Sequence, residues 1–247
     1  MRVLLVLCLS LAAAVAAPKS LPRQWMKCPK DGPKVDECLR EAVLVAVKDL
    51  AENGAKEFGV FPIDPLFMST LDIEQGSGPV AIDLRFKDVN FYGLKGAQLR
   101  SVKADVSNFR YKVSVLFPAG VSLKGNYKIN GKVLVLPIRG EGKCDLQIEN
   151  STVEVDIIGK PVTKDGLVYA EVKDFKFVFE TTRLRLQFEN LFNGNKELSA
   201  QMNIFLNENW SEILQELKPA IQDAFGAAFL VISNRIFGKV PYDTLFL

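Results

Sequence analysis

The chain has 247 residues, of which 31 are basic and 29 acidic, so its formal net charge is +2, and it contains no histidine. Because both signs of charge are interspersed along the sequence, we expect no nucleic-acid partner and no attachment to an anionic membrane. The lack of imidazole excludes Ser-His-Asp and Cys-His hydrolases and histidine-ligated zinc centres, so we expect no enzyme, no metal and no cofactor; only catalysis by carboxylates alone stays open.

The first residues predict a secretory signal peptide. Arg2 precedes an apolar run from Val3 to Val15, and Ala14-Val15-Ala16 suits cleavage after a small residue. The run is too short to span a bilayer, and no later segment has eighteen consecutive apolar residues. We therefore expect residues 1–16 to be removed and residues 17–247 to form one exported domain without stable membrane insertion.

Three cysteines remain in the expected mature chain. In an exported protein a disulfide between Cys28 and Cys38 is the default, and closing so short a loop contributes roughly 3 kcal/mol in the chain-entropy model. Cys144 shares one face of a predicted strand with Leu146 and Ile148, so we expect a buried free thiol. An intermolecular disulfide and a reactive thiol are the alternatives.

The region after the cysteines shows first a helical period and then a strand period. Residues 36–58 predict a first helix, because apolar residues recur there at three- and four-residue spacing and Gly59 follows. From Val80 to Phe188 the period is two, which predicts some eight strands. The alternating runs are 80–86, 109–117, 133–135, 144–148, 153–157, 168–172, 175–179 and 184–188.

Glycine-containing dipeptides suggest where these strands turn. We expect turns at Asn130-Gly131, at Gly140-Glu141-Gly142 and at Asp165-Gly166. Between Ile148 and Val153 the alternation changes parity, which predicts a bulge or turn near Asn150. Alternation on one side only predicts an α+β fold in which an antiparallel sheet is apolar on one face and helices cover that face. With 17 phenylalanines, that inner face can form a filled core or enclose a cavity.

The last fifth of the chain predicts one long helix. From Ile213 to Ile236 apolar residues recur at helical spacing, Gly238 and Pro241 end the pattern, and Asn209 is the expected N-cap with Glu212 as its capping-box partner. The helix would have about 29 residues and a length of roughly 43 Å. A helix of that length needs an equally long apolar trough.

Four separated motifs resemble the takeout and juvenile-hormone-binding family of secreted insect proteins. They are Phe61-Pro62-Ile63-Asp64-Pro65-Leu66, Asn190-Leu191-Phe192-Asn193-Gly194, Leu206-Asn207-Glu208-Asn209-Trp210 and Val240-Pro241-Tyr242. The resemblance covers nearly the whole mature chain. It implies a strongly curved antiparallel sheet wrapped around long helices, with an internal apolar tunnel for a lipid-like ligand. The hormone carriers of that family typically have a second disulfide, which Cys144 alone cannot form, so the resemblance is to the takeout-like branch.

The resemblance therefore implies a secreted, non-enzymatic carrier of a hydrophobic small molecule or lipid, which we expect to be a monomer. Tyr111 is the expected polar contact for a ligand oxygen. The candidate ligand-binding residues are Val43, Val47, Leu50, Leu66, Phe67, Leu84, Tyr111, Val113, Phe177, Phe225, Phe229 and Ile232. A secreted signalling or structural protein with a filled core is the alternative.

Two sequons predict N-glycosylation, at Asn150 and at Asn209. We expect Asn150 to be occupied more often, because a glycan on Asn209 would compete with its expected role as a helix cap.

Overall fold

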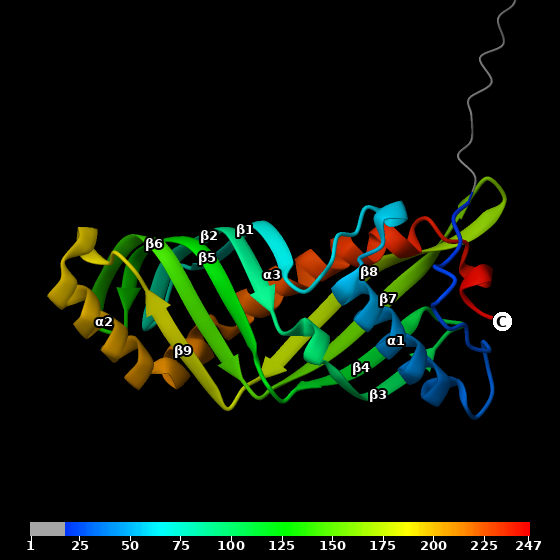
Figure 1. Cartoon of the computed structure of the whole chain (residues 1–247), viewed down its shortest axis with the longest axis horizontal. Coiled ribbons are helices and arrows are strands. Elements are labelled where there is room, and N and C mark those ends of the chain that lie inside the picture. Colours follow the sequence, from blue (N-terminus) through cyan, green and yellow to red (C-terminus); the bar gives the residue numbers. More distant parts are fainter. Residues whose placement is uncertain (1–17) are drawn as a thin grey trace, which may run out of the picture.

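The computed structural model describes residues 18–247, and its strands pair into two antiparallel sheets (Figure 1). The expected signal peptide, residues 1–16, lies outside the described residues. The five-stranded sheet has the order β1 (Leu66–Gln75), β2 (Val80–Tyr92), β5 (Val121–Val133), β6 (Leu136–Glu149) and β9 (Arg183–Phe188). The four-stranded sheet has the order β3 (Gln98–Asp105), β4 (Arg110–Phe117), β7 (Ser151–Lys164) and β8 (Leu167–Glu180).

Asn150 is where the chain passes from one sheet to the other. It is the single residue between β6 and β7, and its φ of 43° lies in the left-handed region. The change of parity that predicted a bulge or turn here is confirmed. Its physical reason is that Ile148 faces the interior from the five-stranded sheet, whereas Val153 does so from the four-stranded sheet.

Two of the three glycine turns predicted from the sequence are wrong. Asn130 and Gly131 lie inside β5, and the hairpin turn falls at residues 134–135. Gly131 is needed because a Cβ there would lie 2.2 Å from the carbonyl oxygen of Ala81 on the next strand. Likewise, the segment Gly140-Glu141-Gly142 lies inside β6, where the chain around Glu189 passes too close for a side chain on Gly142. The turn at Asp165-Gly166 is confirmed.

The first helix is shorter than expected. α1 spans Val35–Glu52, and the chain then turns through Gly54, whose φ is 67°, so that Ala55 pairs with Val60 around a short 3-10 turn. β1 and β3 were not among the predicted runs. The predicted run 133–135 is wrong, because residues 134–135 form the hairpin turn and only Val133 belongs to a strand, as the last residue of β5. The runs 168–172 and 175–179 both lie in β8.

The predicted long helix is confirmed as α3 (Trp210–Phe237), with 28 residues, but the expected cap is wrong. A separate helix, α2 (Lys196–Glu208), runs directly into it. The Asn209 amide therefore donates to the carbonyl of Phe205 in α2 and makes no capping bond to α3. The cap in this region is Asn195, whose side chain accepts a hydrogen bond from the backbone N–H of Leu198 at the start of α2.

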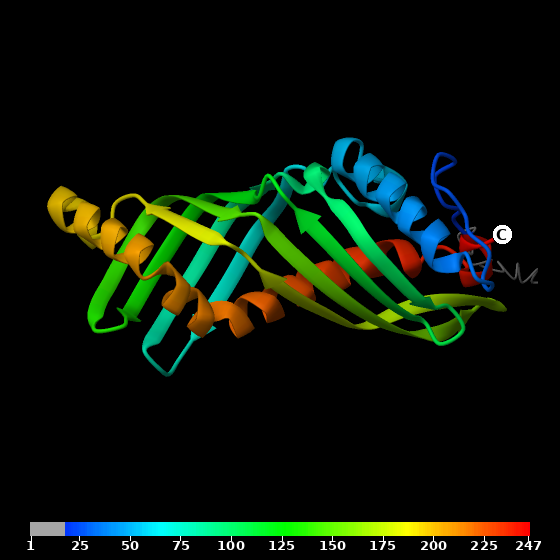
Figure 2. The ribbon, with the colours of Figure 1, turned by 90° about the horizontal axis from the view of Figure 1, so that it is seen from below.

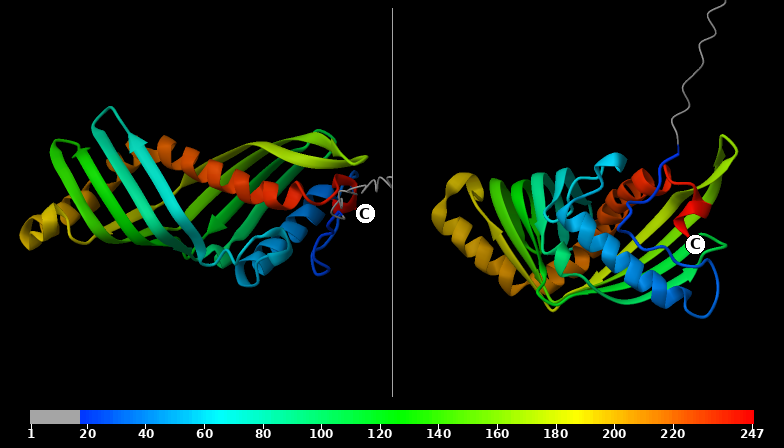
Figure 3. Two further views of the ribbon diagram at one scale, coloured as in Figure 1. Left: turned by 90° about the horizontal axis from the view of Figure 1, so that it is seen from above. Right: turned by 45° about the vertical axis from the view of Figure 1, so that its right-hand side comes forward.

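The helices cover the sheets in distinct places. α3 runs along the length of the molecule across both sheets, while α1 lies at the end occupied by the four-stranded sheet and α2 lies along β9 (Figures 1 and 2). Both views in Figure 3 show the same diagonal course of α3. The expected α+β fold, a curved antiparallel sheet with long helices, is thereby confirmed, with the sheet divided into two hydrogen-bonded ladders.

Helix side chains bond to the backbone of three edge strands. Asn203 and Asn207 on α2 each accept from an N–H of β9 and donate to the carbonyl of the same residue, Phe188 and Leu186 respectively. Asn234 on α3 makes the same pair of bonds with Val172 of β8. On β3, the carboxylate of Asp36 in α1 accepts from the N–H of Ala104 at 3.0 Å. These bonds fix the position of each helix along its strand.

The cysteines are placed as the sequence predicted. A disulfide joins Cys28 to Cys38. Cys144 is a buried free thiol that contacts the carbonyl of Gly125 at 3.6 Å, and burial raises the pKa of this thiol to about 12. Within residues 18–247, no helix has the length and apolar character needed to cross a bilayer. The same residues contain no group of three or more acidic or cysteine side chains arranged to hold a metal ion.

Candidate functional site

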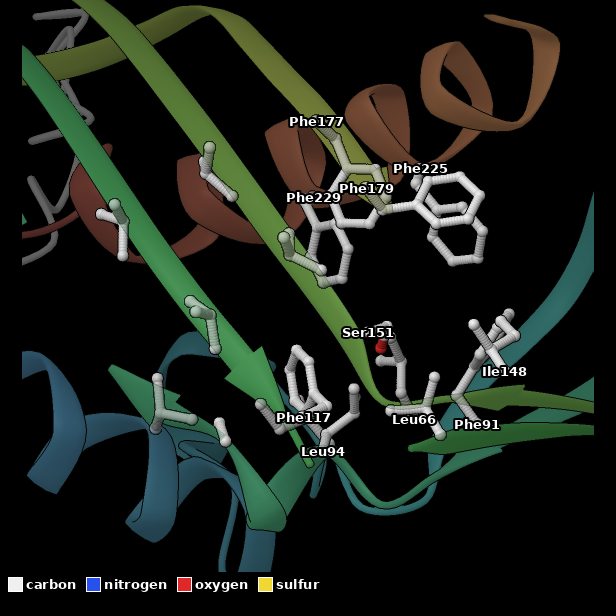
Figure 4. A pocket seen from close by; sticks show the side chains of 18 of the residues that line it. Leu66, Phe91, Leu94, Phe117, Ile148, Ser151, Phe177, Phe179, Phe225 and Phe229 are labelled. Atoms are coloured by element: carbon white, nitrogen blue, oxygen red, sulfur yellow. The ribbon is translucent and has the colours of Figure 1, made fainter. Parts of the chain in front are cut away.

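The inner face of the four-stranded sheet encloses an apolar cavity with a volume of about 250 Å³ (Figure 4). We call it the first cavity. Its walls come mainly from β3, β4, β7 and β8, from two valines of α1 and from the middle of α3. The ends of β1, β2, β5 and β6 that adjoin the four-stranded sheet complete the lining. Of the residues that line it, Ser151 alone has a polar side chain. A space of this size with apolar walls favours an apolar occupant over ordered water, which needs two or more polar partners.

A second cavity, with a volume of about 100 Å³, lies against the five-stranded sheet. Its walls come from β1, β2, β5, β6 and β9, from α2 and from the first half of α3. The two cavities have five lining residues in common: Phe91, Ile148, Phe179, Ile221 and Phe225. They therefore adjoin at one seam, and a few side chains divide the apolar interior into two parts.

Four phenylalanines form one wall of the first cavity. Phe175 and Phe177 lie on β8, and Phe225 and Phe229 lie on α3. Figure 4 shows the side chains of Phe177, Phe225 and Phe229 gathered at this wall. The ring centroids of Phe177 lie 5.3 Å from Phe225 and 5.8 Å from Phe229, and Phe175 lies 5.7 Å from Phe229. These are the separations at which aromatic pairs attract. The pairs hold the middle of α3 against β8, although Phe225 and Phe229 are only half-buried because they border the cavity.

The Asp64 segment positions the opposite wall. The two carboxylate oxygens of Asp64 accept hydrogen bonds from the backbone N–H groups of Gly93, at 3.0 Å, and Lys95, at 2.8 Å. These bonds tie the start of β1 to the loop that follows β2. Leu66 and Leu94, which flank this connection, both line the first cavity.

The structure brings most of the predicted ligand-binding residues to the cavities. Seven of them line the first cavity: Val43, Val47, Leu66, Val113, Phe177, Phe225 and Phe229. Leu84 lines the second cavity. The remaining four, Leu50, Phe67, Tyr111 and Ile232, are not part of either lining.

Each of these four residues lies outside the linings for a different reason. Phe67 is 56% exposed, because successive residues of a strand point to opposite faces and its neighbour Leu66 points inward. Leu50 packs in a second apolar cluster, built from α1 and the C-terminal residues. Ile232 contacts that cluster and the main core, beyond the end of the first cavity.

Tyr111 also packs in the second cluster and does not face a cavity. Its hydroxyl lies 2.5 Å from the hydroxyl of Tyr242, which donates to the carbonyl of Val106 at 2.6 Å. Since the single hydroxyl hydrogen of Tyr242 is used in that bond, Tyr111 is the donor to Tyr242. Burial raises the pKa of both tyrosines, so both hydroxyls stay protonated. The structure does not support Tyr111 as the polar contact for a ligand.

Sequence reasoning missed several lining residues that the strand period would have found. Val153 and Val155 were recognised as an inward-facing run, and Ser151 belongs to the same face two residues earlier. Ser151 was read only as the middle residue of a sequon. Phe91, Phe117 and Ile148 come from strand ends near the seam, where the period alone does not distinguish a cavity wall from a filled core.

Residues 4–247 match the family described as haemolymph juvenile hormone binding protein (JHBP). The chain belongs to this family. Among the relatives of this JHBP-family chain is the circadian clock-controlled protein daywake of Drosophila melanogaster, which is 28% identical over 202 residues, 79% of this chain and 78% of that protein. A putative beta-carotene-binding protein of Schistocerca gregaria is 21% identical over 209 residues, 84% of this chain and 82% of that protein.

The crystal structure of takeout 1 from Epiphyas postvittana has the same fold as this JHBP-family chain. It superposes with a TM-score of 0.73 at 26% sequence identity, covering 88% of this chain and 97% of takeout 1. The predicted resemblance to the takeout and juvenile-hormone-binding family is thus confirmed. The members of this family are binding proteins and not enzymes, which agrees with the function class expected from the sequence.

Proposed function

We propose that this protein is a secreted carrier that holds a hydrophobic small molecule or lipid in the two adjoining cavities and releases it unchanged. The observation that carries the proposal is the lining of the first cavity, where every residue but Ser151 is apolar. An apolar cavity of this kind can bury a ligand, and it contains no group that would act on that ligand chemically.

Burial alone supplies useful affinity. A ligand that hides about 400 Å² of apolar surface gains about 10 kcal/mol gross, at about 25 cal/mol per Å². Lost rigid-body freedom and the ordering of side chains take several kcal/mol back. The dissociation constant should therefore lie between about micromolar and nanomolar.

One relative supports the same class of ligand. The name of the Schistocerca protein describes it as a putative beta-carotene-binding protein, and this supports a long apolar molecule as the cargo. We further propose that export follows removal of residues 1–16, that residues 17–247 act as one ligand-binding domain, and that the carrier works as a monomer.

Native mass spectrometry of protein purified from its natural source tests the proposal directly. We expect an excess mass that disappears on extraction with organic solvent and that belongs to a hydrophobic molecule. Stripped protein should then bind an apolar fluorescent probe saturably, with one molecule of probe displaced by one of the extracted ligand. Protein without excess mass and without saturable probe binding would favour the filled-core alternative.

A further inference from the structure

The side chain of Ser151 is the one polar feature of the first cavity, and its hydroxyl has no hydrogen-bond partner. Ser151 is 2% exposed, and its Oγ is fully buried. The residue lies at the start of β7, where it pairs with Phe117 of β4. In Figure 4 its oxygen stands between the phenylalanine wall and the lower wall that holds Leu66 and Phe117.

An unpaired buried hydroxyl is unfavourable in a folded protein. Nearly all buried polar side chains have a partner, and each exception calls for an explanation. Alanine at this position would fill almost the same space without the cost of removing a hydroxyl from water. The cost disappears if a bound molecule supplies the partner.

The position of Ser151 along the interior adds a second constraint. Ile148, three residues earlier, belongs to the seam shared by both cavities, and Val153, two residues later, pairs with Phe179, which also belongs to the seam. Apolar space therefore extends from Ser151 in two directions. Thr181, the polar residue that lines the second cavity, already donates its hydroxyl hydrogen to the carbonyl of Glu149 at 2.6 Å, so this hydrogen is not available to a ligand.

We propose that Ser151 is the specificity-determining residue of the site and donates a hydrogen bond to an acceptor oxygen carried within an otherwise apolar ligand, such as a ketone. This inference rests on the proposed carrier function. It narrows the ligand class from any hydrophobic molecule to one with an acceptor oxygen flanked by apolar groups. A pure hydrocarbon would leave the hydroxyl unpaired.

The test compares two small volatile probes of equal chain length, 5-nonanone and nonane, with binding to stripped protein measured by depletion of the probe from the headspace. We expect Ser151→Ala to weaken binding of 5-nonanone about tenfold and to leave nonane unchanged, because one buried hydrogen bond is lost. Ser151→Ala keeps the sequon of Asn150 intact, so glycosylation stays constant. Its unfolding midpoint should stay equal to wild type or rise, whereas a structural role for the hydroxyl would lower it.

Val155→Ala is the matched control, because Val155 lies on the same face of β7 and lines the same cavity without a polar group. This variant should weaken the binding of 5-nonanone and of nonane by the same factor. If Ser151→Ala changes the binding of the two probes equally, or changes the binding of neither, the inference about Ser151 is overturned while the carrier function stands. If wild-type protein binds neither probe, both proposals fail together.

Discussion

Replacing Phe229 with alanine tests whether this residue borders a cavity or belongs to a filled core. In a filled core this change opens a new void and costs about 3–5 kcal/mol of unfolding free energy. Phe229 instead borders the first cavity of about 250 Å³ and packs against Phe175, Phe177 and Phe225 on β8 and α3. Its removal enlarges a space that already exists. The cost is then mainly the loss of apolar burial for a half-buried ring, about 2 kcal/mol.

Phe58→Ala is the control for this measurement. Phe58 is 1% exposed and lines neither cavity, so its truncation should cost the full 3–5 kcal/mol. The stability changes are read from guanidinium melts of stripped protein, and binding is read from titration with an apolar fluorescent probe. Phe229→Ala should clearly weaken binding of the probe, and Phe58→Ala should leave it unchanged. The reasoning is refuted if Phe229→Ala costs as much stability as Phe58→Ala and leaves probe binding unchanged.

Three further predictions concern the cysteines and the sequons. Cys144 should resist a thiol reagent in the folded protein up to about pH 10, because burial raises its pKa to about 12, and rapid labelling at pH 8 would contradict this burial. Replacing Cys28 and Cys38 with serine should lower the unfolding free energy by about 3 kcal/mol in denaturant melts, and an unchanged midpoint would count against the chain-entropy estimate. Glycopeptide mapping should find Asn150, which is exposed, occupied more often than Asn209, whose amide is bonded to α2; the reverse order would refute this assignment.

Much of the strand content could be predicted, because the period of two survives wherever one face of a strand is buried. The positions of the glycines do not predict the turns, for a physical reason. A glycine in a turn and a glycine beneath a closely crossing strand look the same in sequence, and Gly131 is of the second kind. Only the neighbouring strand, which comes from residues some fifty positions earlier, decides between them.

For the candidate site, the sequence predicts which side chains point inward but not which of them reach the cavity. The helical period placed Phe225 and Phe229 on one face, and both line the first cavity. The strand period likewise placed Tyr111 and Val113 on one face of β4, yet Val113 lines the cavity and Tyr111 lies beyond its end, beside Tyr242. A period identifies which face points inward. How far the cavity extends along that face depends on α1 and the C-terminal residues, which pack against it from far away in the sequence.

The side chains of Asn203, Asn207, Asn234 and Asp36 have a consequence for the behaviour of the protein in concentrated solution. An open sheet edge is a template on which a second molecule can add a strand, and this is a common route to aggregation. On β9, β8 and β3, an incoming strand would first have to displace side chains that already occupy backbone hydrogen-bonding groups. Substituting Asn203 and Asn207 together with leucine would free backbone groups of β9, and light scattering should then detect self-association that wild-type protein does not show.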